Sequence, residues 1–223
     1  MNDLLTWSAA LVTVASLVVY ELALLVEQRR RPARLGRTAH ATLRQEWFGA
    51  VSAHPGSEIL AVQTLRNSLM SATMTASTAL LALIGAATLS APSLHASFSD
   101  TAGLPYWSAR LALELVLLAL LFASIVSSAM AVRFYNHVGF VCRMPVGSDA
   151  RQHWTAAGNR YVRRAGILYS WGLRHLIFVA PILASIVHPL AGPPAAIIII
   201  VVMYGFDHRG VDEPLANTNP LMG

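Results

Sequence analysis

Four ionisable side chains lie inside long apolar stretches of this 223-residue sequence: Glu21, Glu114, Arg174 and His175. A charge at mid-membrane costs about 3 kcal/mol or more, and it marks an ion, proton or ligand path unless it has a partner. At about 1.5 Å of helical rise per residue, Glu21 lies about 9 Å and Arg174 about 12–15 Å from the Arg-rich ends of their stretches. We therefore expect these two to pair. Glu114, about 10 Å from the opposite end of its own stretch, matches them less well in depth.

The expected pair of Glu21 and Arg174 has three interpretations. A single Arg–Glu bridge can lock two helices together. Alternatively, with His175 the pair can line a polar path for an ion, a proton or an anionic ligand. The third interpretation is contact with lipid headgroups or water.

A second polar group is expected at one rim of the protein, where arginines and amides gather at the ends of several apolar stretches. Arginine donors in such a group can bind a phosphate or a carboxylate. Alternatively, they anchor anionic lipid headgroups and supply the positive charge typical of cytoplasmic loops. The residues of this inner rim are Arg66, Asn67, Arg133, Asn136, His137, Asn159 and Arg160.

Metal or cofactor binding finds little support in the eight His and seven Met residues. Met70 and Met74 share a helix face, and soft sulfur with imidazole suits copper(I), but no HxxxH, ExxH or CxxC spacing occurs. Only His175 lies clearly inside an apolar stretch, whereas haem needs facing histidines. No Gly-rich phosphate loop or GxSxG motif is present either. We predict no metal, no cofactor and no catalytic residue.

The composition identifies the class of protein that must position these residues. Hydrophobic residues make up 55% of the chain and charged residues only 12%, with a mean hydropathy of +0.54. A soluble domain carries about 25% charged residues, so the sequence predicts an integral membrane protein. The net charge of +5 lies in blocks between the apolar stretches, which indicates membrane topology and not nucleic-acid binding.

The apolar stretches predict an all-α polytopic transmembrane bundle that forms a single domain over residues 1–223. Four firm spans are expected, and a fifth is short, with a buried half-helix or re-entrant piece as its alternative. Residues 38–53 are expected to form an interfacial cytoplasmic helix with Leu43, Trp47 and Val51 on its apolar face and Arg44 turned away. The spans lie at about 4–26, 66–90, 108–132, 165–187 and 193–206, and residues 207–223 are expected to form a mobile tail.

Residues 61–87, which lead into the second span and form most of it, are rich in small and hydroxyl side chains. Small side chains let membrane helices approach closely, so we expect this helix to be the central packing helix. We expect residues 91–106 to form a loop, Ser57 to cap the second span's helix, and Asp149 to cap the helix that leads into the fourth span.

The arginines predict the orientation of the chain. The first and third connections hold seven and six arginines, and residues 91–106 hold none. Because basic connections stay in the cytoplasm, we expect a multi-pass protein of the inner (cytoplasmic) membrane with its N-terminus outside.

Three blocks of sequence carry a family resemblance. They are AVQTLRNSLMSATMTASTAL at 61–80, AVRFYNHVGFVC at 131–142, and the run from Asn159-Arg160 through WGLRHLIFVAPIL at 171–183. In this order and spacing they resemble the family called domain of unknown function 599, small multi-span membrane proteins of bacteria and plants. Its members tend to carry Tyr-His where this chain has Tyr20-Glu21. The resemblance implies the helical membrane fold and no activity.

The sequence favours two functions, and a third possibility, a membrane enzyme or redox subunit, needs a bound cofactor that the sequence does not indicate. The first is a structural or accessory module that associates with itself or joins a larger membrane complex, with the bilayer, its anionic headgroups and other membrane subunits as partners. The second is a small transporter or channel that uses Glu21, Arg174 and His175 as a path. A dry, paired Arg174 favours the first function, and a water-filled cavity that reaches Arg174 favours the second.

Overall fold

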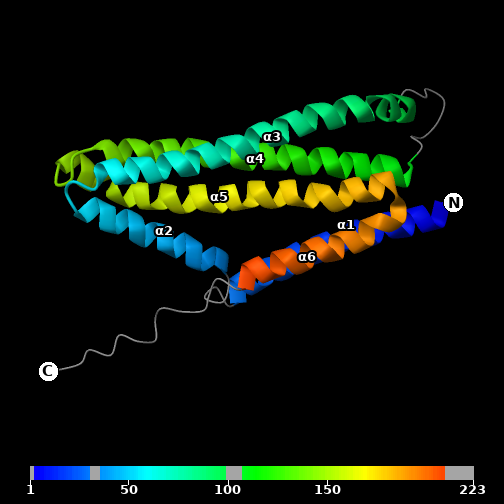
Figure 1. The fold of residues 1–223 in the computed structure, drawn as a ribbon, viewed down its shortest axis with the longest axis horizontal. Coiled ribbons are helices and arrows are strands. Elements are labelled where there is room, and N and C mark those ends of the chain that lie inside the picture. The colour runs from blue at the N-terminus through cyan, green and yellow to red at the C-terminus, as the bar shows by residue number, and fades with distance from the viewer. Residues whose placement is uncertain (1–2, 31–35, 99–106, 209–223) are drawn as a thin grey trace.

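The computed structural model describes residues 3–30, 36–98 and 107–208, and within these ranges the chain is helical without a strand (Figure 1). This confirms the all-α fold. A single 3₁₀ turn, Pro189–Ala191, joins the last two helices. The helices are α1 (Asp3–Arg30), α2 (Gly36–Ala53), α3 (Glu58–Phe98), α4 (Ala109–Arg143), α5 (Asp149–Val187) and α6 (Gly192–His208).

Five of the described helical segments are long and apolar enough to cross a membrane. Four of them are α1, α3, α4 and α5, as expected from the first four spans. The fifth is the 20-residue segment Pro189–His208, which contains the 17 residues of α6. At helical rise, 20 residues cover about 30 Å, the thickness of a bilayer core.

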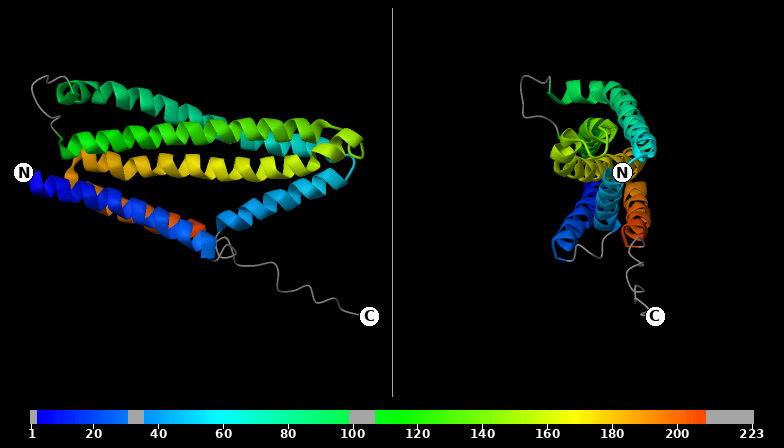
Figure 2. Two further views of the ribbon diagram at one scale, coloured as in Figure 1. Left: turned by 180° about the vertical axis from the view of Figure 1, so that it is seen from behind. Right: turned by 90° about the vertical axis from the view of Figure 1, so that its left-hand side faces the viewer.

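The long helices α3, α4 and α5 lie side by side (Figures 1 and 2). Helix α4 packs against both α3 and α5, which contact each other much less. Helices α1 and α6 lie together against one half of this core, and α2 packs on the other half. We call the half with α1 and α6 the N-terminal half, and the half with α2 the hairpin half. The 41 residues of α3 would span about 60 Å, about twice the thickness of a bilayer core.

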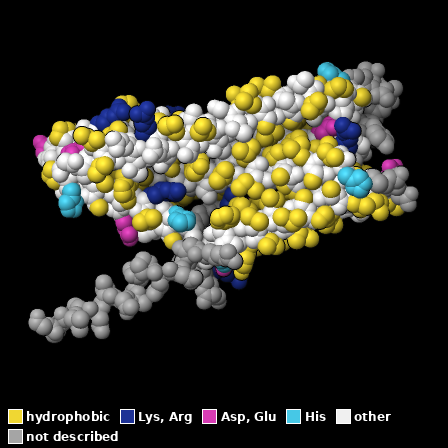
Figure 3. All heavy atoms as spheres, viewed as in Figure 1, with side chains coloured by type: hydrophobic (Ala, Val, Ile, Leu, Met, Phe, Trp, Pro, Cys, Tyr) yellow, Lys and Arg dark blue, Asp and Glu magenta, His cyan; other side chains and the backbone are white. Residues whose placement is uncertain are grey.

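Each half has its own buried apolar cluster. Leu117 and Ile182 lie in the cluster of the N-terminal half, with residues of α1 and α6. Phe48, Leu65 and Val138 lie in the cluster of the hairpin half. Figure 3 shows hydrophobic side chains over much of the N-terminal half, and most of the visible arginines on the hairpin half. The apolar surface agrees with a membrane around the N-terminal half.

Helix α3 lies at the edge of the bundle, so the prediction of a central packing helix was wrong. It packs mainly on α4 and exposes its other faces, including Met74 and Leu81. Small side chains permit close packing but do not fix how many neighbours a helix has. The helix also continues through residues 91–98, where we expected a loop. Ser93 stabilises this extension because its hydroxyl donates to Glu114 on α4.

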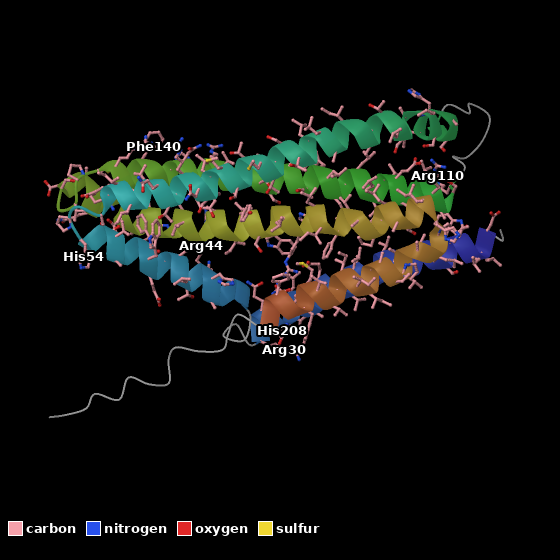
Figure 4. All side chains as sticks on the ribbon, in the orientation of Figure 1. Arg30, Arg44, His54, Arg110, Phe140 and His208 are labelled. Atoms are coloured by element: carbon pink, nitrogen blue, oxygen red, sulfur yellow. The ribbon has the colours of Figure 1, made fainter. Side chains whose placement is uncertain are left out.

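Helix α2 buries a face that only partly matches the prediction, because Trp47 and Val51 are half-buried against the cluster of the hairpin half but Leu43 is not. Phe48 is fully buried and packs over Gly158 of α5. The Arg44 guanidinium lies over Gly166 of α5, and Figure 4 shows Arg44 between α2 and α5. Leu43, predicted to lie on the packed face, is 61% exposed. The two glycines of α5 leave room for the larger side chains, so packing against α5 and not apolar periodicity decides which face is buried.

The turns also differ from the prediction in detail. Ser148, and not Asp149, caps α5 by accepting a hydrogen bond from the Arg151 N–H at 3.2 Å. Ser57 precedes α3, but its hydroxyl donates to the carbonyls of Val51 and His54. Gly56 and Gly147 take φ values of 88° and 89°, a left-handed conformation that favours glycine. Residues 209–223 of the expected tail and 99–106 of the expected loop lie outside the described residues.

The contact between α2 and α5 predicts a steric effect at Gly158. A Cβ at this position would lie 2.4 Å from the Phe48 ring, so Gly158→Ala should lower the free energy of unfolding by about 1–3 kcal/mol. Adding Phe48→Leu should make the double variant no less stable than Phe48→Leu alone. Gly139→Ala on α4 is the matched control, because nothing lies within 4 Å of its added Cβ. Equal stability of the Gly158 and Gly139 variants in a denaturant titration would contradict the packing described.

Candidate functional site

Arg174 of α5 joins three helices. Its Nη1 lies 3.0 Å from Oε1 of Glu21 on α1. Its Nη2 donates to both carboxylate oxygens of Asp207 on α6. The Arg174 side chain is only 4% exposed. The structure thus brings the predicted partners Glu21 and Arg174 together and adds a second carboxylate.

Asp207 is the partner that the sequence reasoning missed, because we placed it in the mobile tail. It is a buried residue of α6, and its Oδ2 accepts a hydrogen bond from the Tyr20 hydroxyl at 2.7 Å. One residue further on, His208 Nε2 lies 3.4 Å from Oε2 of Glu27 on α1. The tail prediction is therefore wrong for Asp207 and His208, whose contacts attach the end of α6 to α1.

The cluster of Tyr20, Glu21, Arg174 and Asp207, which we call the Arg174 cluster, lies at a similar depth on all three helices. Helical rise places its members about 20–27 Å from the N-terminal-half ends of their helices. In a bilayer core of about 30 Å, this puts the cluster near the far boundary of the membrane and not at its middle. The low dielectric there strengthens each ion pair and makes an unpaired charge costly.

The remaining polar atoms around the cluster are few. Glu21 Oε2 and His175 Nδ1 are buried and have no hydrogen-bond partner among the described residues. The His175 ring stacks on Trp171 with ring centroids 5.5 Å apart. His175 therefore lies next to Arg174 in sequence without bonding to the cluster. Two carboxylates around one guanidinium give the ionised cluster a formal charge of −1.

Glu114 belongs to a separate pair near the N-terminal-half end of α4. It is buried, and its Oε1 lies 3.0 Å from Nε of Arg110, one helical turn earlier. Its Oε2 accepts from the Ser93 hydroxyl of α3. Glu114, whose expected depth matches that of Arg174 less well, thus pairs with Arg110 instead.

The inner-rim residues are not gathered into one site. Arg66 and Asn136 line a small cavity of about 140 Å³ between α3 and α4. His137 packs against Tyr161, with ring centroids 5.6 Å apart. Asn159 is half-buried, and its Oδ1 has no partner within the described ranges. The exposed residues of the set are Arg66, Asn67, Arg133, Asn136, His137 and Arg160.

Arg151 is a second residue whose role the sequence did not indicate. It is 1% exposed, although in the sequence it is one of the six arginines of the third connection, whose charge indicates topology. Its Nη1 donates to the carbonyls of Val141 and Met144 at 2.6 and 3.0 Å, and its Nη2 donates to Ser52 Oγ at 3.2 Å. A cation at a helix C-terminus is favourable, so Arg151 caps α4 and attaches α2 to the α4–α5 turn.

Comparison with known proteins gives a family and no closer relative. Residues 8–210 match the family model described as "Protein of unknown function, DUF599". No curated protein and no solved structure matches the chain. Within the described ranges, no three His, Cys, Asp or Glu side chains come together to hold a metal ion.

Proposed function

The chain belongs to the DUF599 family, and we propose that it is a membrane-embedded helical module that associates with a second copy or with another membrane subunit through α3. The observation that carries this proposal is the position of α3. It is a helix rich in small side chains, lies at the edge of the bundle, and packs mainly on one neighbour. Its small residues Ala72, Thr75 and Ala79 are buried within the bundle, so the surface left for a partner is mostly large and apolar. Van der Waals packing of such a surface drives helix association in membranes.

The exposed surface of α3 has a helical repeat suited to a partner helix. Its members recur every three or four residues, which places them on one stripe of the helix. The hydroxyl of Thr88 donates to the Ile84 carbonyl of α3 itself, so this hydroxyl needs no other partner in lipid. We call this surface the outward face of α3: Met70, Met74, Ser77, Leu81, Ile84 and Thr88, all exposed.

The closed Arg174 cluster supports a structural module over a transporter. Arg174 is paired on both sides and nearly inaccessible. Two cavities of the N-terminal half, about 230 and 440 Å³, are lined by other residues. A transport path needs ionisable groups that water or substrate can reach. The arrangement therefore favours a lock between helices.

The arrangement of arginines supports the proposed orientation in the inner membrane. Arg133, Arg143 and Arg160 are exposed on the hairpin half. By the positive-inside rule this half faces the cytoplasm, with the N-terminus outside. Counted by helical rise, Arg133 and Arg160 lie about 36 and 40 Å from the N-terminal-half ends of their helices, at the level of anionic lipid headgroups, whereas Arg66 lies about 48 Å away.

Cysteine cross-linking in native membranes tests the association. In a Cys142→Ala background, Ser77→Cys places a thiol on the outward face of α3. We expect a bifunctional thiol reagent to give a product of twice 24.0 kDa, or one that contains another subunit. Val19→Cys is the matched control, because Val19 is an exposed apolar residue of α1. If Ser77→Cys gives no more product than Val19→Cys, the proposal is wrong.

A further inference from the structure

A groove of about 440 Å³ lies between α3 and α5 in the N-terminal half, with α4 as its floor. Its walls are apolar, and Leu89 and Leu183 on the two sides are themselves exposed, so the groove opens laterally toward lipid. A site of this volume is within the range of about 300–1,000 Å³ typical of ligand pockets. The lining includes Gly85 and Leu89 of α3, Leu117 and Leu121 of α4, and Val179 and Leu183 of α5.

One end of the groove carries charge. Arg110 and Glu114 both line it there, and their salt bridge uses only Nε of Arg110. The Arg110 side chain is 70% exposed, and its terminal nitrogens have no hydrogen-bond partner in the described part of the chain. Figure 4 shows Arg110 at the N-terminal-half end of α4. Glu114 is buried and holds the Nε of Arg110, while the terminal nitrogens of the Arg110 guanidinium remain exposed.

The length of the groove corresponds to one leaflet of a bilayer. From Arg110 to Leu121, α4 rises about 16 Å. Half of a bilayer core is about 15 Å thick. With the arginine at the end of the helix and the apolar walls extending inward, the groove runs from headgroup level to about the midplane.

We propose that this groove binds a phospholipid from the leaflet at the N-terminal half, with one acyl chain between α3 and α5 and the phosphate on Arg110. The apolar walls fit the acyl chain, and the charged end fits the phosphate, which guanidinium binds well. A second copy of this chain would instead meet α3 on its outward face. The groove residue Gly85 borders that face, because it lies four residues after Leu81 and three before Thr88.

A photoreactive phospholipid tests the assignment. The purified full chain is reconstituted with phosphatidylglycerol that carries a diazirine on one acyl chain, and mass spectrometry locates the cross-linked residues. We expect labelling at groove residues. Gly85→Leu should reduce that labelling about tenfold, because Gly85 has open space around its Cβ and a larger side chain fills the groove without striking the core. Gly139→Leu, also open around the Cβ, is the matched control.

The headgroup contact is tested separately with diacylglycerol that carries the same diazirine but lacks phosphate. Arg110→Gln should lower phosphatidylglycerol labelling about tenfold, to the level of diacylglycerol, and leave diacylglycerol labelling unchanged. Labelling outside the groove, or equal labelling of Gly85→Leu and Gly139→Leu, would overturn the proposal. So would equal capture of the two lipids by the natural chain, or a second copy of the chain cross-linked through the groove residues.

Discussion

Arg174→Gln is expected to lower the free energy of unfolding by about 3–5 kcal/mol, the largest of the expected effects. The change leaves the carboxylates of Glu21 and Asp207 buried without the guanidinium that compensates both. The measurement is reversible unfolding in mixed micelles with increasing denaturing detergent, followed by helical circular dichroism.

The matched control for Arg174→Gln is Arg163→Gln, which removes an exposed arginine from the same helix. Surface substitutions of this kind change stability by about 0.5 kcal/mol or less. Equal unfolding curves for the two variants would show that the Arg174 cluster contributes nothing to stability. Glu21→Gln should be milder than Asp207→Asn, since Asp207 has both Arg174 and Tyr20 as partners.

Arg151→Ala is expected to lower the free energy of unfolding by about 3 kcal/mol and to destabilise the hairpin half locally. The carbonyls of Val141 and Met144 lose a charged donor, and Ser52 of α2 loses its link to α5. Hydrogen exchange should become faster in α2 and in the last turn of α4. Exchange in α1 and in most of α6 should stay unchanged, because α2 touches α6 only near Gly36 and Asp207.

Arg143→Ala is the control for Arg151→Ala. It removes an exposed arginine at the end of α4, the helix that Arg151 of α5 caps. This variant should exchange as the natural chain does. If Arg151→Ala accelerated exchange evenly through all helices, or matched Arg143→Ala, Arg151 would not be the link that joins α2 to the α4–α5 turn.

The sequence was sufficient to predict the apolar part of each spanning helix and the pairing of Glu21 with Arg174, although not the extension of α3 through residues 91–98. Helical rise is nearly constant, so residues on helices that cross a common bilayer can be matched in depth from their sequence positions alone. The same rule would have found Asp207, which lies about 22 Å along α6 from Gly192. We missed it because we ended the helix with the apolar run at Phe206, whereas its ion pair with Arg174 extends the helix to His208.

Features that depend on packing between distant segments could not be predicted. Arg151 looks like any loop arginine until α2 folds over it. The buried face of α2 is set by Gly158 and not by the apolar spacing within α2. Similarly, the small residues of α3 suit a central or a peripheral helix equally, and only the positions of α4 and α5 place α3 at the edge.

A thermodynamic cycle at positions 174 and 207 tests the central claim most directly, namely that the Arg174 cluster is a closed lock between helices. The free energy of unfolding is measured for the natural chain, Arg174→Gln, Asp207→Asn and the double variant. The structure predicts a coupling energy of about 2 kcal/mol or more. That is, the loss of unfolding free energy in the double variant should be smaller than the sum of the two single losses by this amount. A coupling of less than about 0.5 kcal/mol would mean that the two residues act independently, and would contradict the lock.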